Sequence, residues 1–145
     1  MGGAAAGARR GAGAVGFRVV RRAAALAAAA LVSSTASGAP DVLKGEQVYA
    51  RCMACHALAF DRVGPRHCGL IGRRAGSVPG FDYSAAMKRS KIVWDEKTLD
   101  RFLAGPLKMV PGSTMTYDGI SDRRERADLI AYLKQAGQTA ECTKR

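Results

Sequence analysis

The first forty residues contain no acidic side chain, because all 12 Asp and Glu residues lie from Asp41 onward. The same stretch holds five arginines, then an apolar run over 23–32, then small polar residues. This order is typical of a secretory signal peptide. The apolar run is too short to span a bilayer comfortably, so we expect cleavage within 34–40 rather than a retained anchor. The predicted division is a leader over 1–36 and an exported domain over 37–145.

Aromatic residues are scarce, with only nine in 145 residues. Much of the 48% apolar content is alanine in the leader, so the exported domain has a modest core. Domains this small are often stabilised by a covalent cross-link or a cofactor. The sequence also lacks internal repeats and any sustained alternation of apolar and polar residues. These absences argue against a strand-based fold and favour helices.

Caps and apolar spacing predict four helices separated by long loops. The predicted helices cover residues 41–51, 84–89, 95–104 and 122–135. Ser121 is the expected N-cap of the last helix, and Gly137 its expected end, with a short tail beyond. Segments 57–80 and 105–120 are rich in glycine and proline. Loops this long are unusual in a compact domain, and we interpret them as segments that wrap a large, rigid cofactor.

The basic surplus of the chain shrinks once the leader is removed. Five of the 23 basic residues lie in the leader, which leaves 18 against 12 acidic residues in the exported domain. Nucleic acid is not an expected partner for an exported protein. The surplus fits electrostatic steering toward acidic docking sites on other proteins, and ordinary solubilising charge is the alternative interpretation.

The stretch "RCMACHALAF" concentrates the chemistry of the chain. Cys52, Cys55 and His56 form the pattern Cys-x-x-Cys-His, which is the attachment signature of c-type haem. Two thiols three residues apart can bond the two vinyl groups on one edge of a porphyrin. The adjacent histidine is then held beneath the iron as an axial ligand.

Three other interpretations of the same pattern must be weighed. A thioredoxin-like dithiol expects a strand-to-helix context, which this sequence lacks. A structural zinc site needs four ligands, and further donors could come from His67, Cys68 and Cys142. A local disulfide between the two motif cysteines is the third. Export and the loop composition favour haem over all of these.

A haem iron in an electron carrier usually takes a second axial ligand, and methionine raises its reduction potential. Met53 lies inside the attachment loop and cannot reach the other face, and Met87 lies on a short predicted helix where packing is expected. Met109 and Met115 both follow in the long loop. The stretch "VPGSTM" favours Met115, because Pro111 restricts the backbone and the next glycine permits a turn.

Five stretches together resemble class I c-type cytochromes, the mitochondrial and bacterial cytochrome c family. They are "GEQVYARCMACH", "VGPRHCGLIGRRAGSVPGFDYS", "VWDEKTLDRFLAGP", "VPGSTMTYDGI" and "RADLIAYLK". The resemblance covers nearly all of residues 41–136. It implies a small all-α fold, in which the N- and C-terminal helices cross and short helices and long loops wrap one covalently bound haem c. The implied activity is single-electron transfer, and the implied protein is not an enzyme.

The resemblance assigns roles to individual residues around the haem. Cys52 and Cys55 would form the thioethers, His56 would be the proximal ligand and Met115 the distal ligand. The carbonyl of Pro65 would accept a hydrogen bond from the other nitrogen of His56, which fixes the ring and its basicity.

The resemblance also points to residues farther from the iron. Arg73, Tyr83 and Trp94 match positions that hydrogen-bond a haem propionate, with surface or core roles as the alternatives. Gly45 and Tyr49 on the first helix match the helix-crossing residues that meet Tyr132 on the last helix.

Three features depart from the family pattern. The segment between His56 and Pro65 is several residues shorter than in the mitochondrial form. Phe102 stands where many members have a tyrosine whose hydroxyl bonds the methionine sulfur, so we expect a shifted potential. His67 stands where an apolar haem contact is usual. Because it follows on the His56 side of the chain, we expect polar packing or surface exposure there rather than iron ligation.

Two cysteines remain once the haem has taken its pair. Spare cysteines in an exported protein suggest a disulfide, here between Cys68 and Cys142, with two independent thiols as the alternative.

The function implied by the resemblance is that of a soluble, monomeric electron carrier in the bacterial periplasm. Expected partners are a quinol–cytochrome c reductase, a terminal oxidase, a photosynthetic reaction centre or a periplasmic dehydrogenase, with membrane contact only through them unless the leader is retained. Candidate docking residues are Lys88, Arg89, Lys91 and Lys108. Two alternatives stay open: a haem-based sensor or peroxidase-like enzyme with a labile sixth ligand, and a dedicated electron-transfer subunit of an oxidoreductase complex.

Overall fold

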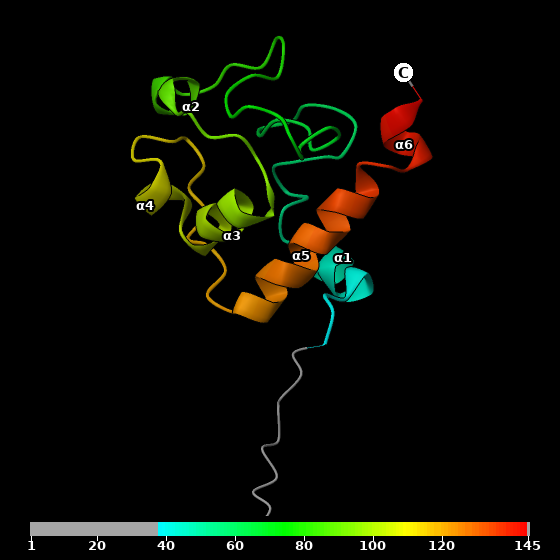
Figure 1. Cartoon of the computed structure of the whole chain (residues 1–145). Coiled ribbons are helices and arrows are strands. Elements are labelled where there is room, and N and C mark those ends of the chain that lie inside the picture. The colour runs from blue at the N-terminus through cyan, green and yellow to red at the C-terminus, as the bar shows by residue number, and fades with distance from the viewer. Residues whose placement is uncertain (1–37, 145) are drawn as a thin grey trace, which may run out of the picture. The chain divides into compact units, whose positions relative to one another are not determined.

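The computed structural model describes residues 38–144, so the predicted leader lies outside the described residues. This part of the chain is helical, as expected (Figure 1). Its helices are α1 (Val42–Tyr49), α2 (Ala85–Arg89), α3 (Glu96–Ala104), α4 (Pro106–Met109), α5 (Arg123–Ala136) and α6 (Ala140–Thr143). Arg74 and Val93 form an isolated antiparallel bridge between two loops. Over 38–144, no helix has the length and hydropathy that a membrane crossing requires.

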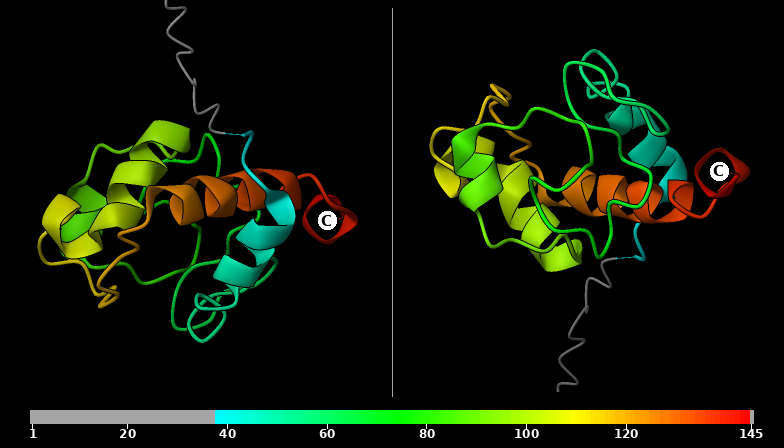
Figure 2. Two further views of the ribbon diagram at one scale, coloured as in Figure 1. Left: turned by 90° about the horizontal axis from the view of Figure 1, so that it is seen from below. Right: turned by 90° about the horizontal axis from the view of Figure 1, so that it is seen from above.

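The terminal helices α1 and α5 cross and pack against each other, as the resemblance implied (Figures 1 and 2). Gly45 is buried at the crossing, and a Cβ there would lie 2.8 Å from the Cβ of Tyr132. The backbone N–H of Asp41 donates to the buried carboxylate of Asp128 at 2.7 Å, which ties the start of α1 to α5. Helix α5 places Leu129, fully buried, in the core of the domain.

The helix starts follow from side-chain caps. The carboxylates of Asp41 and Asp95 cap α1 and α3, and Ser84 caps α2, so each helix begins one residue after the predicted bound. The prediction that Ser121 caps the last helix is wrong. Asp122 is the N-cap, because its carboxylate accepts a hydrogen bond from the Glu125 N–H at 2.8 Å.

Two short helices were not predicted. The chain turns at Gly105, where α3 ends as expected, and Pro106 then occupies the first turn of α4, where its missing N–H is no loss. Helix α6 lies in the predicted tail beyond the last long helix. Both have only four residues, too few for apolar periodicity to reveal them.

Two long loops connect the helices, one from α1 to α2 and the other from α4 to α5. Figure 2 shows the loop that leads to α2 running between α1 and α2. Backbone hydrogen bonds order it, including Gly72 N–H to the Trp94 carbonyl at 2.8 Å and Ala75 N–H to the Ile92 carbonyl at 2.9 Å. The loop after α4 is held at its far end by Arg126, whose guanidinium donates to the carbonyl of Ile120 at 2.8 Å. These loops form the walls of the site described next.

Candidate functional site

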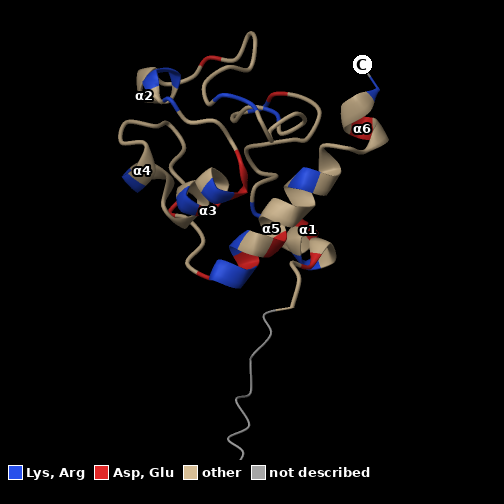
Figure 3. Cartoon of the chain, in the orientation of Figure 1, with Lys and Arg blue, Asp and Glu red and all other residues tan. Residues whose placement is uncertain are grey.

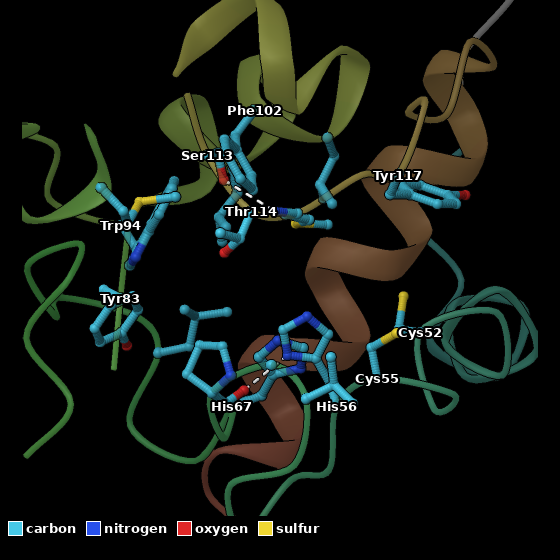
Figure 4. A pocket seen from close by; sticks show the side chains of 18 of the residues that line it. Cys52, Cys55, His56, His67, Tyr83, Trp94, Phe102, Ser113, Thr114 and Tyr117 are labelled. Atoms are coloured by element: carbon cyan, nitrogen blue, oxygen red, sulfur yellow. Dashed lines mark hydrogen bonds between the residues drawn. The ribbon is translucent and has the colours of Figure 1, made fainter. Parts of the chain in front are cut away.

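A cavity of about 380 Å³ lies between the helices and the long loops (Figure 4). Every site residue expected from the sequence lines it: Cys52, Cys55, His56, Pro65, Arg73, Tyr83, Trp94 and Met115. Much of the remaining wall is apolar, from Leu70, Leu99 and Phe102 to Leu129 of α5. The fold thus brings residues separated by up to about sixty positions to one cavity.

The Cys-x-x-Cys-His motif follows directly on the end of α1. The N–H groups of Cys55 and His56 both donate to the Cys52 carbonyl, at 3.1 and 2.9 Å, so the motif forms one tight turn. Both motif thiols are free, which does not support a disulfide between them. Burial raises the pKa of the Cys52 thiol. The turn brings both sulfurs and the imidazole to the same cavity.

The zinc interpretation finds no support in the described part of the chain. Between residues 38 and 144, no group of three or more His, Cys, Asp or Glu side chains is arranged to hold a metal ion. Cys68 and Cys142 are joined by a disulfide instead, with their Cα atoms 5.1 Å apart. This bridge matches the pairing expected for the two leftover cysteines.

His56 is held by backbone groups on the loop that follows it. Its Nδ1–H donates to the Pro65 carbonyl at 2.7 Å. Gly64 lies against the same ring: a Cβ there would overlap Cε1 and come within 2.6 Å of both ring nitrogens. Burial lowers the pKa of His56. The imidazole is therefore neutral, and with the proton on Nδ1 its Nε2 has a lone pair available for a metal.

The loop after α4 brings a further sulfur atom, that of Met115, to the cavity. Ser113 and Thr114 lie across the cavity from His56 (Figure 4). The Met115 N–H donates to the Ser113 hydroxyl at 3.2 Å, and the preceding turn contains Gly112 at φ 86°. Met87, which was expected only to pack, is buried and also lines the cavity. Two methionines therefore line the cavity.

The remaining predicted residues form another part of the wall. Arg73 donates to the carbonyls of Cys68 at 2.9 Å and Arg66 at 2.8 Å. Trp94 is buried and its ring lies 4.9 Å from that of Phe102. Burial raises the pKa of Tyr83, which also lines this wall.

His67 has a closer relationship to the site than sequence reasoning foresaw. It packs among polar groups, as expected, but its ring also stacks on His56, with centroids 4.3 Å apart and planes inclined by 21°. A hydrogen bond of 3.2 Å joins its Nδ1 to the Tyr49 hydroxyl. Burial lowers the pKa of His67 to about 3, so the ring is neutral. The sequence signal was only the histidine at an otherwise apolar position.

The donor set and the cradle fit a covalently attached haem. Two free thiols and a neutral imidazole come from one turn, and a thioether comes from a different loop. Gly64 leaves room for the imidazole that any side chain would displace. The surrounding wall is largely apolar, which suits a porphyrin ring.

Comparisons with known proteins agree with this chemistry. Residues 42–137 match the cytochrome c family model. The chain is 47% identical over 119 residues to cytochrome c2 of Rhodomicrobium vannielii, covering 79% of this chain and 95% of that protein. It is 43% identical over 100 residues to cytochrome c of Sesamum indicum, covering 66% and 90%. The structure of cytochrome cH from Methylobacterium extorquens superimposes with a TM-score of 0.64 at 43% identity, covering 66% of this chain and 98% of that one.

The family match extends from α1 through α5 and includes the motif that carries the thiols. The chain therefore belongs to the cytochrome c family: it is a single-domain electron carrier with covalently bound haem c, and not an enzyme.

Proposed function

We propose that Cys52 and Cys55 form the two thioethers to the haem and that His56 and Met115 are its axial ligands. The observation that carries this proposal is that these four side chains, from two separate segments, line one cavity. Bound haem supplies an iron that cycles between the ferrous and ferric states. The chain's part is to keep both axial ligands in place in each state, so that little rearrangement accompanies electron transfer.

The Pro65 carbonyl orients the proximal ligand. As the acceptor of the Nδ1 proton, it keeps Nε2 directed away from the loop and increases the electron donation of the ring. Gly64 supports the same orientation, since a larger residue would push the imidazole out of place.

Arg73, Tyr83 and Trp94 are proposed contacts of the haem propionates. All three line the cavity. The two carbonyls that accept from Arg73 anchor its guanidinium beside the cavity, where its positive charge would attract a carboxylate. The indole N–H of Trp94 and the hydroxyl of Tyr83 are donors of the kind that a buried carboxylate needs.

The proposed setting is the bacterial periplasm, with a monomeric carrier over 37–145 released by cleavage of the 1–36 leader. The cytochrome c2 relatives are bacterial proteins, which supports this setting. The proposed redox partners are a quinol–cytochrome c reductase, a terminal oxidase, a photosynthetic reaction centre or a periplasmic dehydrogenase. Lys88, Arg89, Lys91 and Lys108 are exposed on or beside α2 and α4 and would steer docking (Figure 3). The N-terminal mass of the protein from a periplasmic extract tests the cleavage.

An optical comparison of two methionine variants tests the axial ligands. Met115→Leu should abolish the long-wavelength sulfur-to-iron charge-transfer band of the ferric protein and let the ferrous protein bind carbon monoxide. Met87→Leu is the matched control, because this methionine also lines the cavity, and it should keep the wild-type spectrum.

The reverse result would make Met87 the ligand. A high-spin ferric spectrum of the wild type, or carbon monoxide binding without denaturant, would mean that the sixth position is open. Haem released into acidified organic solvent would refute the thioethers, since covalently attached haem stays with the chain.

A further inference from the structure

His67 lines the cavity but has no part in the roles proposed above. Its ring stacks on His56 at a centroid separation of 4.3 Å and an inclination of 21°. This separation is slightly shorter than the range of about 4.5–7 Å that is typical of interacting aromatic rings. Because the two near-parallel rings lie together, they cannot be the two axial ligands on opposite sides of one haem. The stack is therefore a contact between the proposed ligand and a second, non-ligating imidazole.

His67 is itself held firmly by the scaffold. Its backbone N–H donates to the carbonyls of Ala57 and Leu58, each at 3.1 Å, and its Nδ1 bonds the Tyr49 hydroxyl at 3.2 Å. The next residue, Cys68, is buried and tied by its disulfide to the tail. A side chain fixed by these contacts can transmit a constraint to its neighbour.

The contacts continue from His67 to the crossing of the terminal helices. Tyr49, buried at the end of α1, meets the His67 ring edge-on with centroids 5.6 Å apart. The Tyr49 ring also packs against the ring of Tyr132 on α5, with centroids 5.2 Å apart. Rings from α1, α5 and the loop thus form a connected series that ends on His56.

Besides His67, two groups restrain His56: the Pro65 carbonyl at Nδ1 and the backbone of Gly64, which lies against the ring. The hydrogen bond to the Pro65 carbonyl fixes the position of Nδ1 but permits the ring to turn about the N–H···O direction. A flat partner at stacking distance opposes that turn, because tilting either plane would separate the faces or make them collide.

We propose that His67 is a positioning residue whose stacked ring sets the plane of the His56 imidazole and links it, through Tyr49, to the crossing of α1 and α5. This inference rests on the proposed role of His56 as the axial ligand. The plane of an axial imidazole selects which iron d orbital carries the unpaired electron of the ferric state. It therefore governs how that electron spreads over the porphyrin, which proton shifts of the ring methyl groups report.

Three substitutions at His67 separate stacking from other effects, measured by proton NMR of the ferric holoprotein. His67→Phe keeps a flat ring and should retain the wild-type order and spread of the methyl shifts. His67→Leu and His67→Gln remove the ring and should both change the pattern, although glutamine can still bond the Tyr49 hydroxyl. Tyr49→Phe loosens only the anchor and should move the same signals by less.

Wild-type methyl shifts in His67→Leu would overturn the proposal, and so would equal changes in His67→Phe and His67→Leu. An unchanged pattern in Tyr49→Phe would remove Tyr49 from the constraint. If His67→Leu does not fold, His67→Gln carries the same comparison. The proposed function fails separately: a wild type without the His/Met optical spectrum refutes the ligand assignment, whereas a normal spectrum with insensitive shifts refutes only the role of His67.

Discussion

The Cα of Gly45 lies directly against the Asp128 carbonyl, so that a Cβ at this position would overlap the oxygen and come within 2.6 Å of the carbonyl carbon. Neither group can move alone, because each belongs to the backbone of a helix. The crossing of α1 and α5 is therefore as close as it is only because residue 45 has no side chain.

Gly45→Ala should force these helices apart. We expect a loss of about 3 kcal/mol in the free energy of unfolding, at the upper end of the usual cost of overpacking. Chemical denaturation followed by circular dichroism measures it. Gly137→Ala is the control, because a Cβ there meets nothing nearer than 3.5 Å. Equal midpoints for Gly45→Ala and wild type would contradict the close approach.

The disulfide between Cys68 and Cys142 closes a loop of 74 residues. The chain-entropy estimate for a loop of this length is about 4 kcal/mol. Replacing both cysteines with alanine should lower the unfolding free energy by up to about this amount. Backbone amides of α6 should then exchange with solvent far faster, whereas amides near the start of α5 should be less affected. An unchanged denaturation midpoint would show that the bridge contributes nothing to stability.

Arg126 secures the end of the loop that carries Met115. Its guanidinium donates to the carbonyls of Ile120 and Ser121 and, through Nε, to Asp100 at 2.7 Å. Arg126→Met should cost about 3 kcal/mol, since it leaves buried acceptors unpaired.

The ferric charge-transfer band of Arg126→Met should also fade at a lower temperature than in wild type, because the loop is freer to withdraw the sulfur. Arg123→Met, an exposed change at the start of the same helix, should stay within about 0.5 kcal/mol of wild type. If the band fades at the same temperature in wild type and Arg126→Met, Arg126 does not hold the Met115 loop in place.

Phe102 is buried in the cavity wall, where the family often has a tyrosine. Phe102→Tyr would add a hydroxyl that can donate to the methionine sulfur and reduce its electron donation to iron. Since that donation helps to set the reduction potential, we expect a shift of about 30 mV or more, which corresponds to roughly 0.7 kcal/mol for one electron. Redox titration measures it, and an unchanged potential would contradict the idea.

The pKa of Asp95 is held below its usual value, because the backbone N–H and then the hydroxyl of Thr98 donate to its carboxylate. Its folded pKa is therefore lower than its unfolded pKa of about 3.9. The stability it contributes is present above the unfolded pKa and is lost as the pH falls through the folded pKa. Asp95→Asn keeps a cap acceptor without the charge. The difference between the denaturation midpoints of wild type and Asp95→Asn should shrink on acidification, and a constant difference would contradict this origin.

The chemistry of the chain was readable from the sequence because it is local. Cys52, Cys55 and His56 fall within five residues, and the Met115 segment carries its own proline and glycine turn. Helix boundaries were predictable to within about two residues where an Asp or Ser supplies a cap. They were missed for α4 and α6, which are too short for apolar periodicity to register.

Contacts between distant residues were decided only by the tertiary structure. His67 and His56 are eleven positions apart on an irregular loop, and no periodicity rule places two loop side chains face to face. The sequence predicts the proposed ligands of the iron, because that prediction depends on residue type and local spacing. How firmly those ligands are oriented depends on the packing of α1, α5 and the loops around them, and that packing exists only once the chain has folded.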